Sequence, residues 1–292
     1  MQKKSVFEVM TLCIVVILCC NPVGTHLNYD DQICPLANHN IEVAENLMEI
    51  VRDTLEEARG QGLNISEEEI IVTEAEKLLQ KVKKFNLQSN NCITGNMYTI
   101  KSIKLLEKSL ELLNAKMNTL RDEEYAVYRA LIEQVTELFL VRYEYDELQF
   151  IVIIDHTSGC EPDEDLNKVL EWVGQEMPLA EQETLDSFQL RNKESHPLGD
   201  YFNLSVEVVL VSIEEVREIF LKGNEWEEYD AKYPFSQGTM TLSRVGFNAE
   251  MNQALLFVEN MSYESVGAGC YILFTKENDD WIIQDWVISW IS

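Results

Sequence analysis

The chain has 292 residues, of which 46% are apolar, so it can bury one large hydrophobic core or two ordinary ones. It has 51 Asp and Glu residues against 23 Lys and Arg residues, which gives a formal net charge of -28. This charge repels phosphate groups, so we expect no nucleic acid partner and no attraction to anionic lipid head groups.

Residues 1–25 are predicted to be a signal peptide or a lipoprotein signal. Lys3 and Lys4 precede the apolar run Val9–Cys20, which is too short to span a bilayer but has the length of a signal-peptide core. Cleavage after the small residues near Gly24 would release a secreted protein. Alternatively, Cys20 follows an apolar residue three positions earlier, as in a lipobox, and would receive a lipid anchor. Both alternatives predict an extracytoplasmic protein, secreted or lipid-anchored in the cell envelope, with membrane contact only through that anchor.

Four cysteines follow the predicted signal. Disulfides persist in exported proteins, and we expect the pairs Cys34–Cys92 and Cys160–Cys270, with free buried thiols as the alternative. Since no two of these cysteines form a C-x-x-C pair, the sequence does not indicate a zinc site.

The first half of the mature chain is predicted to be a polar tether over residues 26–40 and a helical unit over residues 41–121. Apolar residues recur at spacings of three and four over 44–58, 71–85 and 103–120, which is typical of helices that bury one face. The 103–120 stretch has an a/d seam that needs an apolar partner helix. A fourth helix is predicted after it, with apolar residues over 128–139.

Residues 122–292 are predicted to form an α+β domain. An apolar strand over 148–155 is followed by helices near 162–173 and 179–190, a strand over 202–211 and a helix over 213–222. The last part alternates short apolar runs with turns, among them Asn278–Asp280, which favours an antiparallel meander. The predicted fold class is therefore α+β, with a helical N-terminal unit followed by helices packed on an antiparallel β-sheet.

Five motifs in the carboxyl-terminal part resemble an uncharacterised family of exported bacterial proteins. They are Tyr233–Gly238, Leu242–Asn248, Gln253–Leu255, Gly267–Tyr271 and the ending Lys276–Ser292. The resemblance extends back to Glu124-Tyr125 and covers about 170 residues of the chain. It implies an envelope location and an α+β body, and it implies no known activity.

Asp155, His156 and Ser158 stand where an apolar strand ends, a position at which functional groups are common. His156 could act as a general base oriented by Asp155, which would suit a hydrolase. The alternative is a turn in which these side chains cap the strand end. The sequence contains no G-x-S-x-G elbow to support the hydrolase.

Glu161, Asp163 and Asp165 form an acidic cluster that could hold a weak calcium ion, although the alternative is that they begin the next helix.

Ligand-binding candidates come from the carboxyl end. Arg244 could bind a ligand carboxylate or phosphate, or pair internally with a carboxylate such as Asp285 or Glu259. Tyr271, Trp281 and Trp286 belong to an aromatic group that could line a pocket or simply pack in the core.

The sequence contains no motif that decides the function. We expect a non-catalytic envelope protein that binds a small ligand or a protein partner, without a cofactor. The alternatives are a hydrolase that uses Asp155 and His156, and a structural or assembly protein that uses the helical unit.

Overall fold

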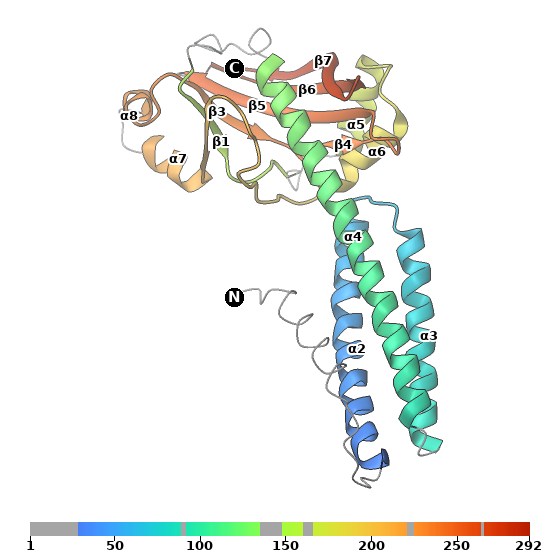
Figure 1. Cartoon of the computed structure of the whole chain (residues 1–292). Coiled ribbons are helices and arrows are strands. Elements are labelled where there is room, and N and C mark those ends of the chain that lie inside the picture. Colours follow the sequence, from blue (N-terminus) through green and yellow to red (C-terminus); the bar gives the residue numbers. More distant parts are fainter. Residues whose placement is uncertain (1–28, 89–91, 135–147, 160–165, 221–224, 264–265) are drawn as a thin grey trace. The chain divides into compact units, whose positions relative to one another are not determined.

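The computed structural model describes residues 29–88, 92–134, 148–159, 166–220, 225–263 and 266–292 (Figure 1). The predicted signal, with Cys20, lies outside these ranges. The helices are α2 (Tyr29–Gly60), α3 (Ser66–Gln88), α4 (Cys92–Gln134), α5 (Leu166–Glu176), α6 (Gln182–Arg191), α7 (Ile213–Phe220) and α8 (Glu225–Lys232). The strands are β1 (Phe150–Ile154), β2 (Glu207–Val211), β3 (Ser236–Leu242), β4 (Gly246–Phe247), β5 (Gln253–Tyr263), β6 (Val266–Glu277) and β7 (Asp280–Ile291).

The chain divides into two compact units. The first contains the described residues up to Met48 together with Thr73–Leu106, and the second contains Glu49–Val72 and Glu107–Ser292. In the first unit three helical segments contact one another through polar groups: Ser102 donates to the carbonyl of Ala75 at 3.0 Å, and Asn40 donates to Asn96 at 2.7 Å. The second unit contains the sheet and the cavity described below.

The helical part differs from the sequence prediction in two respects. Helix α2 begins at Tyr29, so most of the predicted tether is helical. The predicted third and fourth helices are one helix, α4, because no proline interrupts it and its one glycine, Gly95, lies in the first turn. Helix α4 thus continues through the predicted boundary at residue 121.

The fold class is α+β, as predicted, but the sheet is mixed. Its strand order is β2-β1-β3-β5-β6-β7, with β4 paired to β5. Strand β1 is parallel to both neighbours, β2 and β3, because helices connect these strands and allow the chain to return in the same direction. Strands β5, β6 and β7 form the predicted antiparallel meander. The predicted turn between β6 and β7 is present, and Asn278 and Asp279 have the positive φ angles of 51° and 72° that suit a tight hairpin.

The two faces of the sheet are covered by different helices. The later part of α4 crosses one face, where Tyr128 and Leu131 pack with Ile153, Leu256 and Ile272 (Figure 1). On the opposite face α5 and α6 pack over β5 and β6, while α7 and α8 pack over β1 and β2. Since side chains alternate along a strand, odd-numbered residues of β5 and β6 point towards α5 and α6. In the described part of the chain, no helix is both long and apolar enough to cross a membrane.

Candidate functional site

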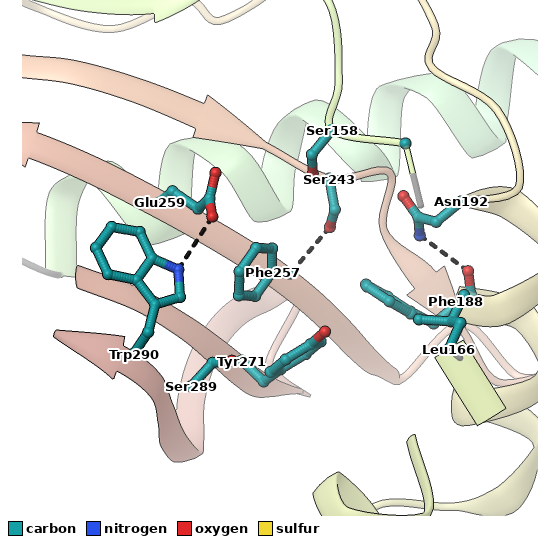
Figure 2. Close-up of a pocket in the computed structure, with 11 residues that line it drawn as sticks. Ser158, Leu166, Phe188, Asn192, Ser243, Phe257, Glu259, Tyr271, Ser289 and Trp290 are labelled. Carbon is teal, nitrogen blue, oxygen red and sulfur yellow. Dashed lines mark hydrogen bonds between the residues drawn. The ribbon is translucent and has the colours of Figure 1, made fainter. Parts of the chain in front are cut away.

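A cavity of about 190 Å³ lies on the α5–α6 face of the sheet (Figure 2). Strands β5, β6 and β7 supply its floor, α5 and α6 supply one wall, and the segments after β1 and β3 supply the other. Most of the lining residues are aromatic or small and polar, and the others are one leucine, one glycine and one carboxylate: Ser158, Gly159, Leu166, Phe188, Asn192, Ser243, Phe257, Glu259, Tyr271, Ser289 and Trp290.

Strand register places the floor residues beside one another. Phe257 of β5 is directly opposite Tyr271 of β6, and their ring centroids are 4.6 Å apart. In the next row on the same face, Glu259 is opposite Gly269, and Gly269 is opposite Trp290 of β7. The floor is therefore two cross-strand rows that reach over three strands.

Gly269 allows the side chains of β5 and β7 to meet. The indole of Trp290 extends over this glycine, and its Nε1 donates to Oε1 of Glu259 at 3.1 Å (Figure 2). A Cβ atom on residue 269 would lie 2.2 Å from that Nε1, so the indole would have to move away. The glycine thus lets the indole lie over β6, and the hydrogen bond to Glu259 fixes it there.

The helical wall is held close to the sheet by a second glycine. A Cβ atom on Gly246 of β4 would lie 2.4 Å from the backbone nitrogen of Phe188, so α6 and β4 approach backbone to backbone. This approach brings the ring of Phe188 within 5.9 Å of the Tyr271 ring, measured between centroids. At the end of α6, Asn192 accepts from the backbone N–H of Arg244 at 2.7 Å and donates to the Arg244 carbonyl at 2.9 Å. The wall of the cavity is therefore fixed by hydrogen bonds and close packing.

A buried ion cluster holds α4 and α6 to the segment after β3. Glu124 of α4 accepts from Arg244 through Nε at 2.9 Å and from Arg191 of α6 at 3.1 Å, and all three residues are buried. Glu124 also accepts from the backbone N–H of Val245 at 2.9 Å. Burial alone would raise the pKa of Glu124, but the charges of the two guanidinium groups and these hydrogen bonds hold it below its ordinary value. Arg244, predicted to pair with Asp285 or Glu259, therefore has Glu124 as its partner.

Three hydrogen bonds position Ser243 at the cavity. Tyr128 of α4 donates to the Ser243 carbonyl at 2.8 Å from the opposite face of the sheet. The Ser243 hydroxyl donates to the Arg244 carbonyl at 3.0 Å and accepts from the backbone N–H of Phe257 at 2.9 Å. Burial raises the pKa of Tyr128 well above its ordinary value, so this phenol stays a neutral donor. The hydroxyl of Ser243 is thus engaged within the protein.

The three candidate catalytic residues are divided between two places. Nδ1 of His156 lies 2.9 Å from Oδ1 of Asp155, and these side chains are 54% and 36% exposed. Neither residue lines the cavity, whereas Ser158 does. The backbone of this segment is hydrogen-bonded to two neighbouring segments. The Asp155 N–H donates to the Val211 carbonyl, and the Ser158 N–H donates to the Leu242 carbonyl. The pair therefore lies at an exposed strand end, apart from the cavity wall to which Ser158 belongs.

Of the four candidate ligand-binding residues, Tyr271 lines the cavity. Trp281 is 3% exposed and packs in the α4-facing core, where its Nε1 donates to Glu123 at 2.9 Å. Trp286 is 47% exposed on β7, the strand at one end of the sheet order. Sequence reasoning missed Glu259, Asn192 and Phe188 as cavity residues. The signal for Glu259 was its spacing of two residues from Phe257, which places both on one face of a strand.

The remaining predicted sites lie largely outside the described residues. This applies to Glu161, Asp163 and Asp165, to Cys160, and to the side chains of Cys34 and Cys92. Within the described ranges, no group of three or more His, Cys, Asp or Glu residues is arranged to hold a metal ion. Cys270 is a free thiol buried in the α4-facing core, which does not match the predicted Cys160–Cys270 disulfide. Burial raises the pKa of this thiol to about 12.

Comparisons of the chain with protein-family models, curated proteins and solved structures find no match. The resemblance of the carboxyl-terminal motifs to a family of exported bacterial proteins therefore stays a prediction.

Proposed function

We propose that this protein is a non-catalytic binding module of the cell envelope, which takes a small ligand in the cavity on the α5–α6 face. The observation behind this proposal is the aromatic floor of Phe257, Tyr271 and Trp290, bordered by a few fixed polar groups. Apolar and aromatic walls with a small number of placed polar groups are typical of ligand sites. The export signal predicted for residues 1–25 supports the envelope location.

The hydrolase alternative finds less support in this geometry. It requires Asp155 and His156 to converge with Ser158 or Arg244 on an open cleft. Instead the two side chains contact each other at the surface, and Arg244 is bound to Glu124 in the interior. The assembly alternative requires an uncovered 103–120 seam, but Leu106, Leu113 and Leu120 of that seam are buried within the chain.

The direct test of ligand binding is to purify the native protein from the cells that produce it and to identify small molecules released on denaturation. A matched pair of variants gives the control. Ser158→Phe places a ring in the cavity, whereas Ser205→Phe places one at an exposed position before β2. We expect a molecule in the wild type and in the Ser205 variant but not in the Ser158 variant. Equal amounts in all three proteins, or none in any, would contradict the proposal.

The same protein preparation tests whether the chain is exported to the cell envelope. Intact mass spectrometry should show either a diacylglyceryl group on a chain that begins at Cys20 or an unmodified chain that begins near Thr25. A chain that retains Met1 would contradict export.

A further inference from the structure

The later turns of α3 and the first turns of α4 differ in charge from the rest of the chain. The 30-residue run Lys77–Leu106 contains six lysines, and none of the 51 Asp and Glu residues falls within it. The net charge of -28 predicts no attraction to anionic lipids for the chain as a whole, but these two helix segments have a local excess of positive charge. We call them the basic end, and all six of its lysine side chains are exposed: Lys77, Lys81, Lys83, Lys84, Lys101 and Lys104.

An exposed apolar stripe lies on the α4 part of the basic end. Ile93, Met97 and Ile100 are 55%, 57% and 37% exposed, and their spacings of four and three residues place them on one face of the helix. Lys104 continues this face one turn later, and Lys101 is beside it. Apolar side chains with lysines around them are typical of helices that lie in the interface of a membrane, because the lysine stems reach past apolar groups towards the lipid phosphates.

The lysines of α3 border the same stripe. The ammonium group of Lys81 lies over the ring of Tyr98, 5.9 Å from its centroid, so this part of α3 is beside the turn of α4 that contains Met97. Lys83 pairs with Glu45 of α2 at 2.7 Å, but the two side chains are 60% and 48% exposed. An exposed pair of this kind is weak, so it leaves Lys83 able to exchange this partner for a lipid phosphate.

The chain enters its first described helix at the same end of these helices. Asn40 of α2 donates to Asn96, in the second turn of α4, at 2.7 Å. Figure 1 shows the start of α2 near the end of α3 and the start of α4. The predicted lipidation site, Cys20, precedes the start of α2 at Tyr29 by nine residues. A lipid anchor at Cys20 would therefore bring the basic end to the bilayer.

We propose that the basic end binds the surface of an anionic membrane, with Ile93, Met97 and Ile100 in contact with lipid and with the lysines beside the lipid phosphates. A second copy of the chain is a poorer occupant of this stripe, because two basic ends would place lysines against lysines. The proposal is independent of the ligand proposed for the cavity, because no residue of the basic end lines that cavity.

Vesicle flotation tests the proposal. The protein is the chain that begins at Thr25, as signal cleavage would leave it, which keeps every described helix and strand and has no lipid of its own. Vesicles with equal parts of phosphatidylcholine and phosphatidylglycerol are compared with vesicles of phosphatidylcholine alone. We expect binding to the anionic vesicles to be at least roughly tenfold tighter and to weaken as salt is added.

Two pairs of variants assign the binding to the basic end. Lys101→Gln should weaken binding to the anionic vesicles roughly fivefold, whereas Lys193→Gln, at an exposed position after α6, should change it less than about twofold. Met97→Gln should weaken binding roughly tenfold, whereas Ile70→Gln, at a position 69% exposed on α3, should change it less than about twofold. All four side chains are exposed, and circular dichroism checks that each variant keeps its helices.

Three results would overturn the proposal. The first is equal binding to the two kinds of vesicle, and the second is an equal effect of the Lys101 and Lys193 variants. The third is a protein that does not bind vesicles but forms a dimer that Met97→Gln dissociates in analytical ultracentrifugation, which would assign the stripe to a contact between copies. None of these results affects the proposed function, which is tested separately by the molecule released from the native protein.

Discussion

The buried carboxylate of Glu124 gives the sharpest prediction about stability. Replacement of this residue by Gln keeps the shape of the side chain but leaves the guanidinium groups of Arg191 and Arg244 without their shared counter-charge in the interior. Removal of one partner from a buried ion pair costs about 3–5 kcal/mol. With a typical urea dependence of about 2 kcal/mol per molar, the unfolding midpoint should fall by about 2 M.

The control for this variant lies two residues earlier in the same helix. Asp122 pairs with Arg121 at 3.0 Å, but the two side chains are 70% and 40% exposed. An exposed pair contributes about 0–1 kcal/mol, so Asp122→Asn should leave the midpoint nearly unchanged. Urea unfolding followed by circular dichroism measures both variants. Equal midpoints for the two variants would refute the claim that the Glu124 cluster holds α4 and α6 to the sheet.

The pKa of Glu124 determines how the loss of unfolding free energy in the Glu124→Gln variant depends on pH. Because this pKa is below its ordinary value in the folded protein, ionised Glu124 stabilises the fold at neutral pH. That stabilisation is present above the ordinary value of 4.5 and is lost as the pH falls through the lower folded value. The gap in unfolding free energy between wild type and the Glu124→Gln variant should therefore be constant near neutrality and shrink below pH 4.5. A gap that grows at acid pH would contradict this assignment.

Three further predictions concern single positions. Gly269→Ala should displace the Trp290 indole and weaken ligand binding, with little loss of secondary structure. Tryptophan fluorescence and calorimetry measure the two effects, and unchanged emission and affinity would contradict the prediction. The buried thiol of Cys270, with its pKa raised to about 12, should resist iodoacetamide in the folded protein and react after unfolding, as mapped by peptide mass spectrometry; labelling of the folded protein would contradict its burial. Trp281→Ala should cost about 3–5 kcal/mol of unfolding free energy, whereas Trp286→Ala, at an exposed position, should cost about 1 kcal/mol or less; similar losses would contradict the different burial of these rings.

The sequence was sufficient for the fold class and for most elements, since their signals are local. Helix periodicity and the Asn278–Asp280 turn each involve residues close in the chain. The start of the helix predicted over 213–222 is local too: Ser212 precedes α7, and its hydroxyl accepts from the backbone N–H of Glu215. The parallel pairing of β1 with β2 and β3 was not predicted, because pairing between distant strands has no local signature. The helix α8 was missed because its sequence is short and strongly polar.

The candidate site was also only partly predictable from the sequence, because distant segments of the chain form it. Tyr271 was found because aromatic residues on a strand suggest a pocket. Phe188 of α6 and Asn192, which follows α6 directly, reach the cavity only through tertiary packing. Arg244 was predicted to bind a ligand or to pair with a carboxylate such as Asp285 or Glu259. Its partner, Glu124, is 120 residues away in sequence. Spacing alone does not identify such a pair.

The most direct test of the central claim is a proton NMR comparison of the indole N–H signals of the native protein, first as isolated and then after it has been denatured, dialysed and refolded to remove any bound molecule. The chain has five tryptophans, and the signal of Trp290 is assigned by its loss in the Trp290→Phe variant. We predict that the Trp290 signal differs between the two preparations, while the signals of Trp281 and Trp286 stay in place. A Trp290 signal that is the same in both preparations would contradict the claim that this cavity holds a small ligand.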